Sequence, residues 1–336
     1  MSNLTAFPFH RALARTDARQ DVVFFVMGLS TSCVESFVKK FLKWPGFVAV
    51  GLVVVVLVGI AWLYFASERE LNRHHEVAAA TPLVIPTDPA EISEGQRLAQ
   101  LAGCMHCHGE KLTGTVVDDI PHLLRLVAPN ISVKLPTYSD AQVVTVLRKG
   151  VKPDGTSVVF MPSEMFRHLN DQDLARVIAF LRTVPANTDG IQEKTEVRLL
   201  GRLILAKGDV TLAAKAIESL PPPTAAYDAA DSVSHGRYLV MNFCTECHGQ
   251  NLEGFAPIAS PPLAVVKGYS AEQFARLMHD GVALGDRQLR MMSPTAKVRF
   301  SHFREDELRA VYAFLQSRSQ AVEAPSVGAT ALATAR

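Results

Sequence analysis

The sequence predicts an all-α chain in which one N-terminal transmembrane helix is followed by two tandem helical domains. Three observations predict this class: an uncharged apolar run over residues 46–66, a Cys-x-x-Cys-His motif that occurs twice, and flanking residues that repeat with each motif. The 336 residues leave room for two domains beside the apolar run, since soluble domains usually span roughly 100 to 200 residues.

Composition excludes one broad class of function. The chain has 34 Lys and Arg against 33 Asp and Glu, which gives a formal net charge of +1. There is no broad basic field to attract phosphate backbones, so we expect no nucleic-acid partner. Hydrophobic residues make up 48% of the chain, and the apolar excess is concentrated in the run over residues 46–66.

The first element is the apolar run from Gly46 to Ala66. As a helix it is about 31 Å long at about 1.5 Å per residue, which is enough to span a bilayer. More cations precede the run than follow it, so we expect residues 1–45 in the cytoplasm and the rest on the periplasmic side of a bacterial inner membrane. These cations are Arg11, Arg15, Arg19, Lys39, Lys40 and Lys43 before the run, and Arg69 and Arg73 after it.

A cleaved signal peptide is the alternative to a membrane anchor. The run is longer than a typical signal core, and the residues that follow it, Ser67 to Glu70, contain no small-x-small cleavage site. We therefore expect an uncleaved, single-pass helix in contact with membrane lipid, followed by a polar stalk over residues 67–90.

Four of the five cysteines form the repeated motif. It reads Cys104-Met105-His106-Cys107-His108 in the first copy and Cys244-Thr245-Glu246-Cys247-His248 in the second. Cys-x-x-Cys-His is the attachment signature of c-type haem. Two thiols on one helical turn reach the two vinyl groups of one porphyrin edge, and the adjacent histidine projects its imidazole to the iron. We expect two covalently bound haem c groups, with His108 and His248 as axial ligands and His106 pointing away from the iron.

Other interpretations use the same cysteines. A four-cysteine zinc site needs two pairs close together, whereas the motifs start 140 residues apart (244 − 104). A thioredoxin-like pair needs a βαβ context, which the sequence does not suggest, and plain disulfides leave both histidines unexplained. The fifth cysteine, Cys33, is expected to stay a free thiol on the cytoplasmic side.

Residues around the motifs also repeat, which predicts two copies of one domain, over residues 91–185 and 232–318. Each copy contains a helix leading into the motif, a long loop, a middle helix, a turn with methionine and a terminal amphipathic helix. The matching segments are His108–Gly114 with His248–Gly254, Tyr138–Gly150 with Tyr269–Gly281, Leu174–Leu181 with Leu308–Leu315, and the single residues Arg97 and Arg237.

The motifs and this order of elements resemble the class I c-type cytochromes, in the form of a membrane-anchored dihaem protein similar to the cytochrome subunits of bacterial periplasmic dehydrogenases. The resemblance covers residues 90–185 and 232–318. It implies that the first and last helices of each domain cross beside the haem. It also implies a methionine shortly before the last helix as the sixth iron ligand.

Two methionines align as this sixth ligand. Met161 lies 11 residues beyond Gly150 (161 − 150), and Met292 lies 11 residues beyond Gly281 (292 − 281). Met161 is followed directly by proline, whereas the second copy has Met-Ser-Pro. The methionines Met165 and Met291 do not align in this way. Histidine is the alternative sixth ligand, and its candidates are His168, His302, His122 and His279.

The resemblance also implies a proline carbonyl that accepts the proximal imidazole N–H and so fixes the ring. Pro129 and Pro261 match that position, although both also fit as ordinary loop prolines. Between the domains, residues 186–231 form a connector with an apolar stretch over 197–205 and a short helix over 212–217. Residues 319–336 are expected to be a disordered tail.

Two classes of function remain open. Six-coordinate irons with His/Met ligation suit a carrier without catalytic activity of its own. Such a chain relays electrons in a respiratory pathway between a dehydrogenase or quinol-oxidising complex and a small carrier or oxidase, as a possible subunit of a larger complex. The alternative is a haem enzyme, either dihaem peroxidase-like or an oxidoreductase of small sulfur species. It would need one open iron site, most readily at Met292.

Overall fold

The computed structural model describes residues 31–78, 80–223 and 226–318. The predictions for the first 30 residues of the cytoplasmic segment and for the tail over 319–336 lie outside these ranges. The described part is mostly helical with few strands, which confirms the predicted fold class. The chain divides into a unit that ends at Trp62 and a unit that begins at Leu63.

The first unit is formed by helix α2. This helix spans Thr31–Leu71, so it extends beyond the predicted run at both ends. Its portion Gly46–Leu71 is the one segment among the described residues that is long and apolar enough to cross a membrane. The side chains over 46–62 are exposed. This apolar surface is consistent with either a membrane anchor or a signal sequence.

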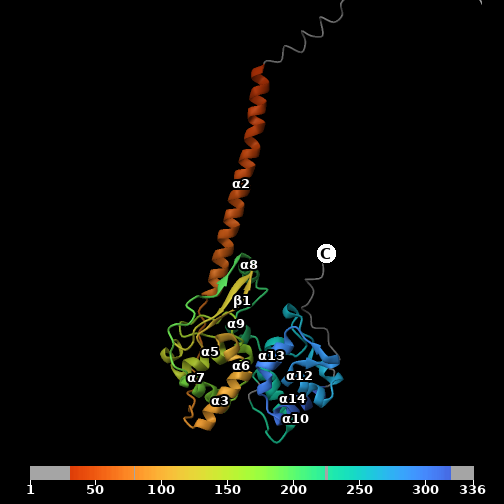
Figure 1. Ribbon diagram of the computed structural model, residues 1–336. Helices are drawn as coiled ribbons and strands as arrows, with labels where there is room; N and C mark the ends of the chain where they lie inside the picture. Colours follow the sequence, from red (N-terminus) through yellow and green to blue (C-terminus); the bar gives the residue numbers. More distant parts are fainter. Residues whose placement is uncertain (1–30, 79, 224–225, 319–336) are drawn as a thin grey trace, which may run out of the picture. The chain divides into compact units, whose positions relative to one another are not determined.

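The second unit contains two helical domains, which Figure 1 shows in different colours along the chain. The first domain contains α3 (Pro89–Leu101), α4 (Cys104–His108), β1 (Thr115–Ile120), β2 (Leu124–Ala128), η1 (Leu135–Thr137), α5 (Asp140–Lys149), α6 (Ser163–Phe166) and α7 (Asp171–Thr183). The segment between the domains contains β3 (Glu196–Val197), α8 (Leu199–Lys207) and α9 (Ala213–Glu218).

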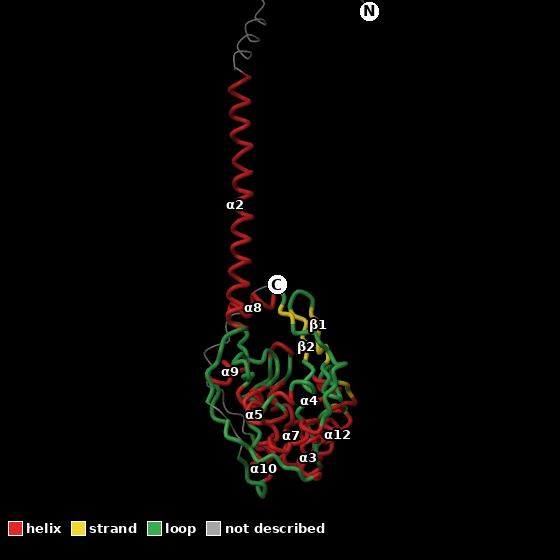
Figure 2. The backbone as a smooth tube through the Cα atoms, turned by 90° about the vertical axis from the view of Figure 1, so that its left-hand side faces the viewer, coloured by secondary structure: helices red, strands yellow, loops and turns green. Residues whose placement is uncertain are grey.

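The second domain repeats this order without the long hairpin. Its helices are α10 (Ser232–Phe243), α11 (Thr245–His248), α12 (Ala271–Asp280), α13 (Met292–Val298) and α14 (Glu305–Ser317). Its short elements are η2 (Ala256–Ile258), η3 (Leu263–Gly268), β4 (Val282–Ala283), η4 (Leu284–Asp286), β5 (Arg287–Gln288) and η5 (Phe300–His302). Long loops connect the helices in both domains (Figure 2).

The middle helices have the same end signals in both copies. The side chain of Ser139 caps α5 and Gln142 completes a capping box, and Ser270 with Gln273 does the same for α12. Both helices end at a glycine in the left-handed region, where other residues are strained. These shared caps explain why the predicted match over 138–150 and 269–281 was visible in the sequence.

In each domain the first helix crosses the last helix at a glycine. A Cβ at Gly95 in α3 would overlap the carbonyl oxygen of Arg176 in α7, and a Cβ at Gly236 in α10 would overlap that of Ala310 in α14. The crossings therefore align Gly95 with Gly236, an offset of 141 residues (236 − 95). The match of Arg97 with Arg237 is off by one residue, because the second copy has one residue fewer between the crossing and the motif.

The long loop of the first domain contains a feature that we did not predict. Strands β1 and β2 form an antiparallel hairpin, and β3 from the connector pairs with β2 as a third strand. The loop from His108 to Pro129 spans 21 residues, whereas the loop from His248 to Pro261 spans 13. The extra residues of the first copy form this hairpin, so the connector is partly built into the first domain.

The segment predicted as a polar stalk also packs on the first domain. Leu83 and Ile85 lie against the hydrophobic core, and the backbone N–H of His75 donates to the carbonyl of Gly155 at 2.9 Å. Nearer to α2, Arg202 of α8 donates to Ser67 at 2.8 Å and lies over the ring of Tyr64. This segment is therefore held against the second unit at both ends.

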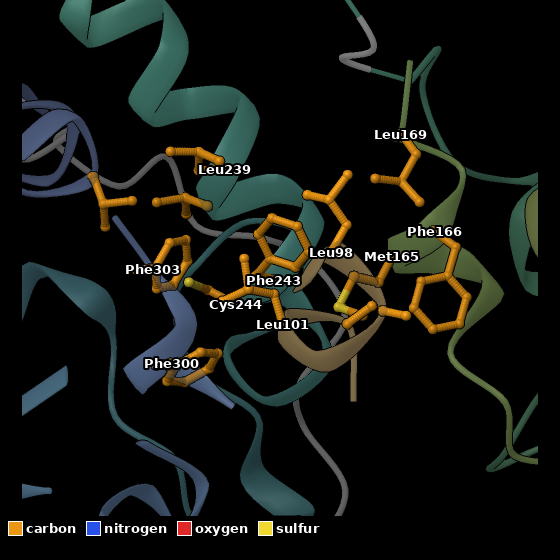
Figure 3. Packing of buried hydrophobic residues seen from close by; sticks show 14 of the residues in the cluster. Leu98, Leu101, Met165, Phe166, Leu169, Leu239, Phe243, Cys244, Phe300 and Phe303 are labelled. Atoms are coloured by element: carbon orange, nitrogen blue, oxygen red, sulfur yellow. The ribbon is translucent and has the colours of Figure 1, made fainter. Parts of the chain in front are cut away.

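The two domains share one continuous hydrophobic core. Figure 3 shows Leu98, Leu101 and Met165 of the first domain beside Phe243 and Phe303 of the second, and all belong to one cluster of buried residues. Burial of apolar side chains from both domains favours a fixed arrangement between them.

Candidate cofactor sites

Each Cys-x-x-Cys-His motif lies on one short helical turn directly after the first helix of its domain. The first motif forms α4, and the second follows α10 and includes α11. All four cysteines are free thiols, and Cys244 is buried while the other three are partly buried. Burial raises the pKa of Cys104 and of Cys244 to about 12, because an apolar environment disfavours the thiolate. The thiols therefore line the apolar wall of each site.

The proximal histidines have the same partner in both copies. Nδ1 of His108 lies 2.8 Å from the carbonyl oxygen of Pro129, and Nδ1 of His248 lies 2.8 Å from that of Pro261. A carbonyl can only accept, so each Nδ1 carries the proton and each Nε2 is left with a lone pair for a metal. Burial lowers the pKa of both imidazoles, and the hydrogen bond to proline opposes this shift. The neutral form is the one that binds iron.

The loop after each motif has the same backbone path. Leu112 and Leu252 are buried in the left-handed region at φ 55° and 65°. The N–H of Gly114 donates to His108 O at 2.8 Å, and the N–H of Gly254 donates to His248 O at 3.0 Å. These bonds turn the chain back over the histidine and bring the proline carbonyl to its ring.

A hydroxyl group also closes each motif from the loop side. Thr115 donates to the carbonyl oxygen of Cys107 at 2.6 Å, and Ser260 donates to that of Cys247. These hydroxyl groups satisfy carbonyls at the end of a short helix, so they hold the second cysteine of each pair in place.

The two aligned methionines are partly buried and lie against the core. Met161 lies just before α6, and Met292 is the first residue of α13. The other two methionines differ in burial, since Met165 is fully enclosed in the core and Met291 is 48% exposed. The burial pattern therefore favours Met161 and Met292 as the side chains that face each site.

The histidines considered as alternative ligands have other surroundings. Nε2 of His168 lies 3.0 Å from Oε1 of Gln250 in the other domain. His122 is exposed in the turn of the β1–β2 hairpin. Nε2 of His279 lies 3.3 Å from Glu305, while His302 is partly exposed. These contacts do not favour bis-histidine ligation.

The donor set fits a covalently attached porphyrin better than a metal ion alone. Among the described residues, no three His, Cys, Asp or Glu side chains converge as they would at a zinc site. Each site instead offers two unpaired thiols on one turn, one oriented imidazole, and one thioether approaching from another element. His106 is exposed, as expected for a side chain that points away from the site.

Sequence reasoning missed one charged pair between the two motifs. Arg299, which precedes η5, is buried and donates from Nη1 to Oε2 of Glu246 at 2.7 Å. Glu246 lies between the two cysteines of the second motif. No local pattern marks Arg299, because its partners lie far away in the sequence and in both domains.

Comparisons with known proteins agree on one family. The cytochrome c family model matches residues 92–185 and 233–319, which together make up more than half of the chain. A fructose dehydrogenase cytochrome subunit of Gluconobacter japonicus is 28% identical over 198 residues, which cover 53% of this chain and 40% of that protein. A diheme cytochrome c-type protein of Cereibacter sphaeroides is 26% identical over 219 residues, which cover 59% of this chain and 67% of that protein. The chain thus spans less than half the length of the first relative.

Proposed function

The chain belongs to the cytochrome c family, whose domains serve haem-based electron transfer, and on this premise we propose that it relays electrons through two covalently attached haem c groups. The observation that carries the proposal is the duplicated donor set. Each copy presents two free thiols and a histidine whose Nδ1 lies 2.8 Å from a proline carbonyl. A bound haem supplies an iron that gains and loses one electron.

The residues of the chain would hold each haem from three sides. Cys104 and Cys107 attach the first haem, with His108 as the proximal ligand and Met161 as the distal one. Cys244, Cys247, His248 and Met292 take the same roles at the second haem. Pro129 and Pro261 support the two proximal histidines. A thioether ligand and an apolar wall both favour the reduced state, so these residues suit a carrier for fairly oxidising partners.

We further propose that α2 anchors the chain in a bacterial inner membrane. The apolar surface over 46–62 and the excess of cations before it support a single-pass helix with a cytoplasmic N-terminus. Residues 91–185 and 232–318 would then be two periplasmic cytochrome domains. This arrangement keeps the thiols in the compartment where disulfides and thioethers normally form.

The partner we propose is a dehydrogenase complex in which this chain is the cytochrome subunit. The likeness to a fructose dehydrogenase cytochrome subunit supports this class of partner and leaves its substrate open. A downstream carrier or oxidase would accept the electrons. The rigid contact between the two domains supports a relay, because it keeps the separation of the two haems constant.

The first experiment is the visible spectrum of the purified, reduced chain with and without carbon monoxide, with covalent haem counted per chain. Two haems and an unchanged spectrum are the expected result. A protein that carries fewer than two haems would refute the dihaem proposal. Uptake of carbon monoxide at one haem would instead favour a haem enzyme with one open iron site, for which no residue in the structure argues at present.

A second experiment tests the partner. In membranes of the native organism, sugar or alcohol substrates of periplasmic dehydrogenases should reduce the haems of this chain, and deletion of the chain should abolish substrate-dependent oxygen uptake. Haems that are reduced only by added quinol would point to a quinol-oxidising complex as the donor.

A further inference from the structure

Arg299 connects the two attachment motifs across the domain interface. Its side chain is buried, and its Nε donates to the carbonyl oxygen of Leu101 at 3.0 Å. Leu101 is the last residue of α3, three positions before Cys104. Through Nη1, the same guanidinium pairs with Glu246 inside the second motif at 2.7 Å. One buried charge therefore contacts the backbone at the first motif and a side chain of the second.

The backbone before the first motif is shaped to receive this side chain. Gly103 lies in the left-handed region at φ 79°, and a Cβ there would lie 2.9 Å from the guanidinium carbon of Arg299. A side chain at this position would push the arginine away from Cys104. Nη2 of Arg299 is buried without a hydrogen-bond partner among the described residues. A buried unpartnered donor is costly, so its retention needs a reason beyond packing.

The interface by itself does not require a charge at this position. Matching hydrogen bonds, His168 N to Met165 O and His302 N to Arg299 O, show that Met165 is the equivalent residue of the first domain. Met165 is fully buried and apolar. Glu246 likewise corresponds to His106, which is exposed. The charged pair is therefore present on one side only of an otherwise repeated contact.

The charge of Arg299 acts on both motifs. Burial raises the pKa of all four thiols, and the positive charge of Arg299 opposes this rise at each of them. Glu246 acts in the opposite direction at Cys107 and at Cys247. The field of one ion pair thus reaches the residues that would hold both haems.

We propose that the Arg299–Glu246 pair sets the reduction potentials of the two haems together, so that a change in either charge moves both potentials in the same direction. The inference rests on the proposed function, because it needs a haem at each motif. A fixed positive charge near a redox centre favours its reduced, less positive state, and a fixed negative charge favours the oxidised state. Burial makes these effects larger than they would be at the surface.

The test is a potentiometric titration of the purified full-length holoprotein at constant pH, with both haems followed in the visible spectrum. Arg299→Met places the residue of the first domain at the equivalent position and leaves Glu246 uncompensated. We expect the reduction equilibrium of both haems to shift by about tenfold toward the oxidised form, about 59 mV for a one-electron couple. Glu246→Gln should shift both haems in the opposite direction, and the double variant should lie between the two.

A matched control is Arg97→Met. Arg97 lies at the same domain interface and pairs with Glu307 at 2.7 Å, so its removal perturbs the interface without touching the Arg299–Glu246 pair. It should leave the difference between the two potentials unchanged and move neither by as much as Arg299→Met. A shift of equal size in this control would mean that any loss at the interface has the same effect, and the proposal would be wrong.

Other outcomes separate this inference from the proposed function. Covalent haem is counted in every sample, and fewer than two haems in the unaltered chain would overturn the proposed function. Two haems whose potentials do not move in either variant would assign the pair a structural role alone. A shift at one haem only would refute the joint effect. If Arg299→Met does not fold, Glu246→Gln and Arg299→Lys still test the sign of the effect.

Discussion

The hydroxyl of Tyr238 donates a hydrogen bond of 2.6 Å to the carboxylate of Asp173 across the interface between the two cytochrome domains. The repeated half of this contact is the pair of Arg97 with Glu307 at 2.7 Å. In each case a residue of a first helix contacts the first turn of the last helix in the other domain. The two domains therefore face each other through an internal, approximately twofold contact.

Removal of the Tyr238 hydroxyl should weaken this contact. Tyr238→Phe should lower the free energy of unfolding by about 1 to 2 kcal/mol, since the buried carboxylate of Asp173 loses one donor while Arg176 and the backbone N–H of Asp173's own helix cap remain. Denaturant titration of the holoprotein measures the change. Tyr312→Phe, which loses a bond to Tyr269 O within the second domain, shows how much is specific to the interface when the unfolding of each domain is followed by its haem.

The helix crossings should tolerate no side chain. Gly236→Ala places a methyl group on the carbonyl oxygen of Ala310, so α10 and α14 must separate, at a cost of several kcal/mol, on the order of 2 to 4. The expected result is a clear drop in the thermal midpoint, with less haem attached to the second motif. Gly268→Ala is the control, because a Cβ there meets nothing within 4 Å. Equal stability of the two variants would contradict the close crossing.

Features that depend on local chemistry could be predicted from the sequence. The motifs, the caps at Ser139 and Ser270, and the spacing of Met161 and Met292 are all encoded within a few residues. Contacts between distant segments could not be predicted in this way. The one-residue shift that pairs Gly95 with Gly236 is visible only where helices cross, because an offset of 140 fits the motif and hides the deletion before it.

The β1–β2 hairpin is a different case. Val116, Val117 and Ile120 favour a strand, and a turn at His122 follows them, so the signal was present in the sequence. Its third strand comes from the connector, about 70 residues later, and no local pattern links the two. Sequence periodicity therefore described each domain well and said little about how the parts are joined.

Stability should depend on pH through His168. Burial lowers the pKa of this imidazole, against a smaller opposing effect of its hydrogen bond to Gln250. The unfolded chain, with an ordinary histidine pKa of about 6.5, then binds the proton more readily than the folded chain. The contribution of His168 is fully present above about pH 6.5 and is lost as the pH falls through the folded pKa. His168→Gln should therefore flatten the fall in the unfolding midpoint between about pH 7 and 5. An unchanged slope would mean that other groups cause the fall.

The final prediction distinguishes the distal ligands. Met161→Leu removes a thioether and keeps an apolar side chain of similar size, so we expect one of the two haems in each chain to bind carbon monoxide and its potential to fall. Met292→Leu should do the same at the other haem. Met291→Leu is the matched control, because Met291 is 48% exposed and precedes Met292 directly. Carbon monoxide difference spectra, scaled to the haem content, measure the bound fraction. If Met291→Leu opened a site and Met292→Leu did not, the ligand would be Met291, and the aligned spacing from Gly281 would have misled us. If neither variant opened the second site, a ligand other than methionine would hold that iron.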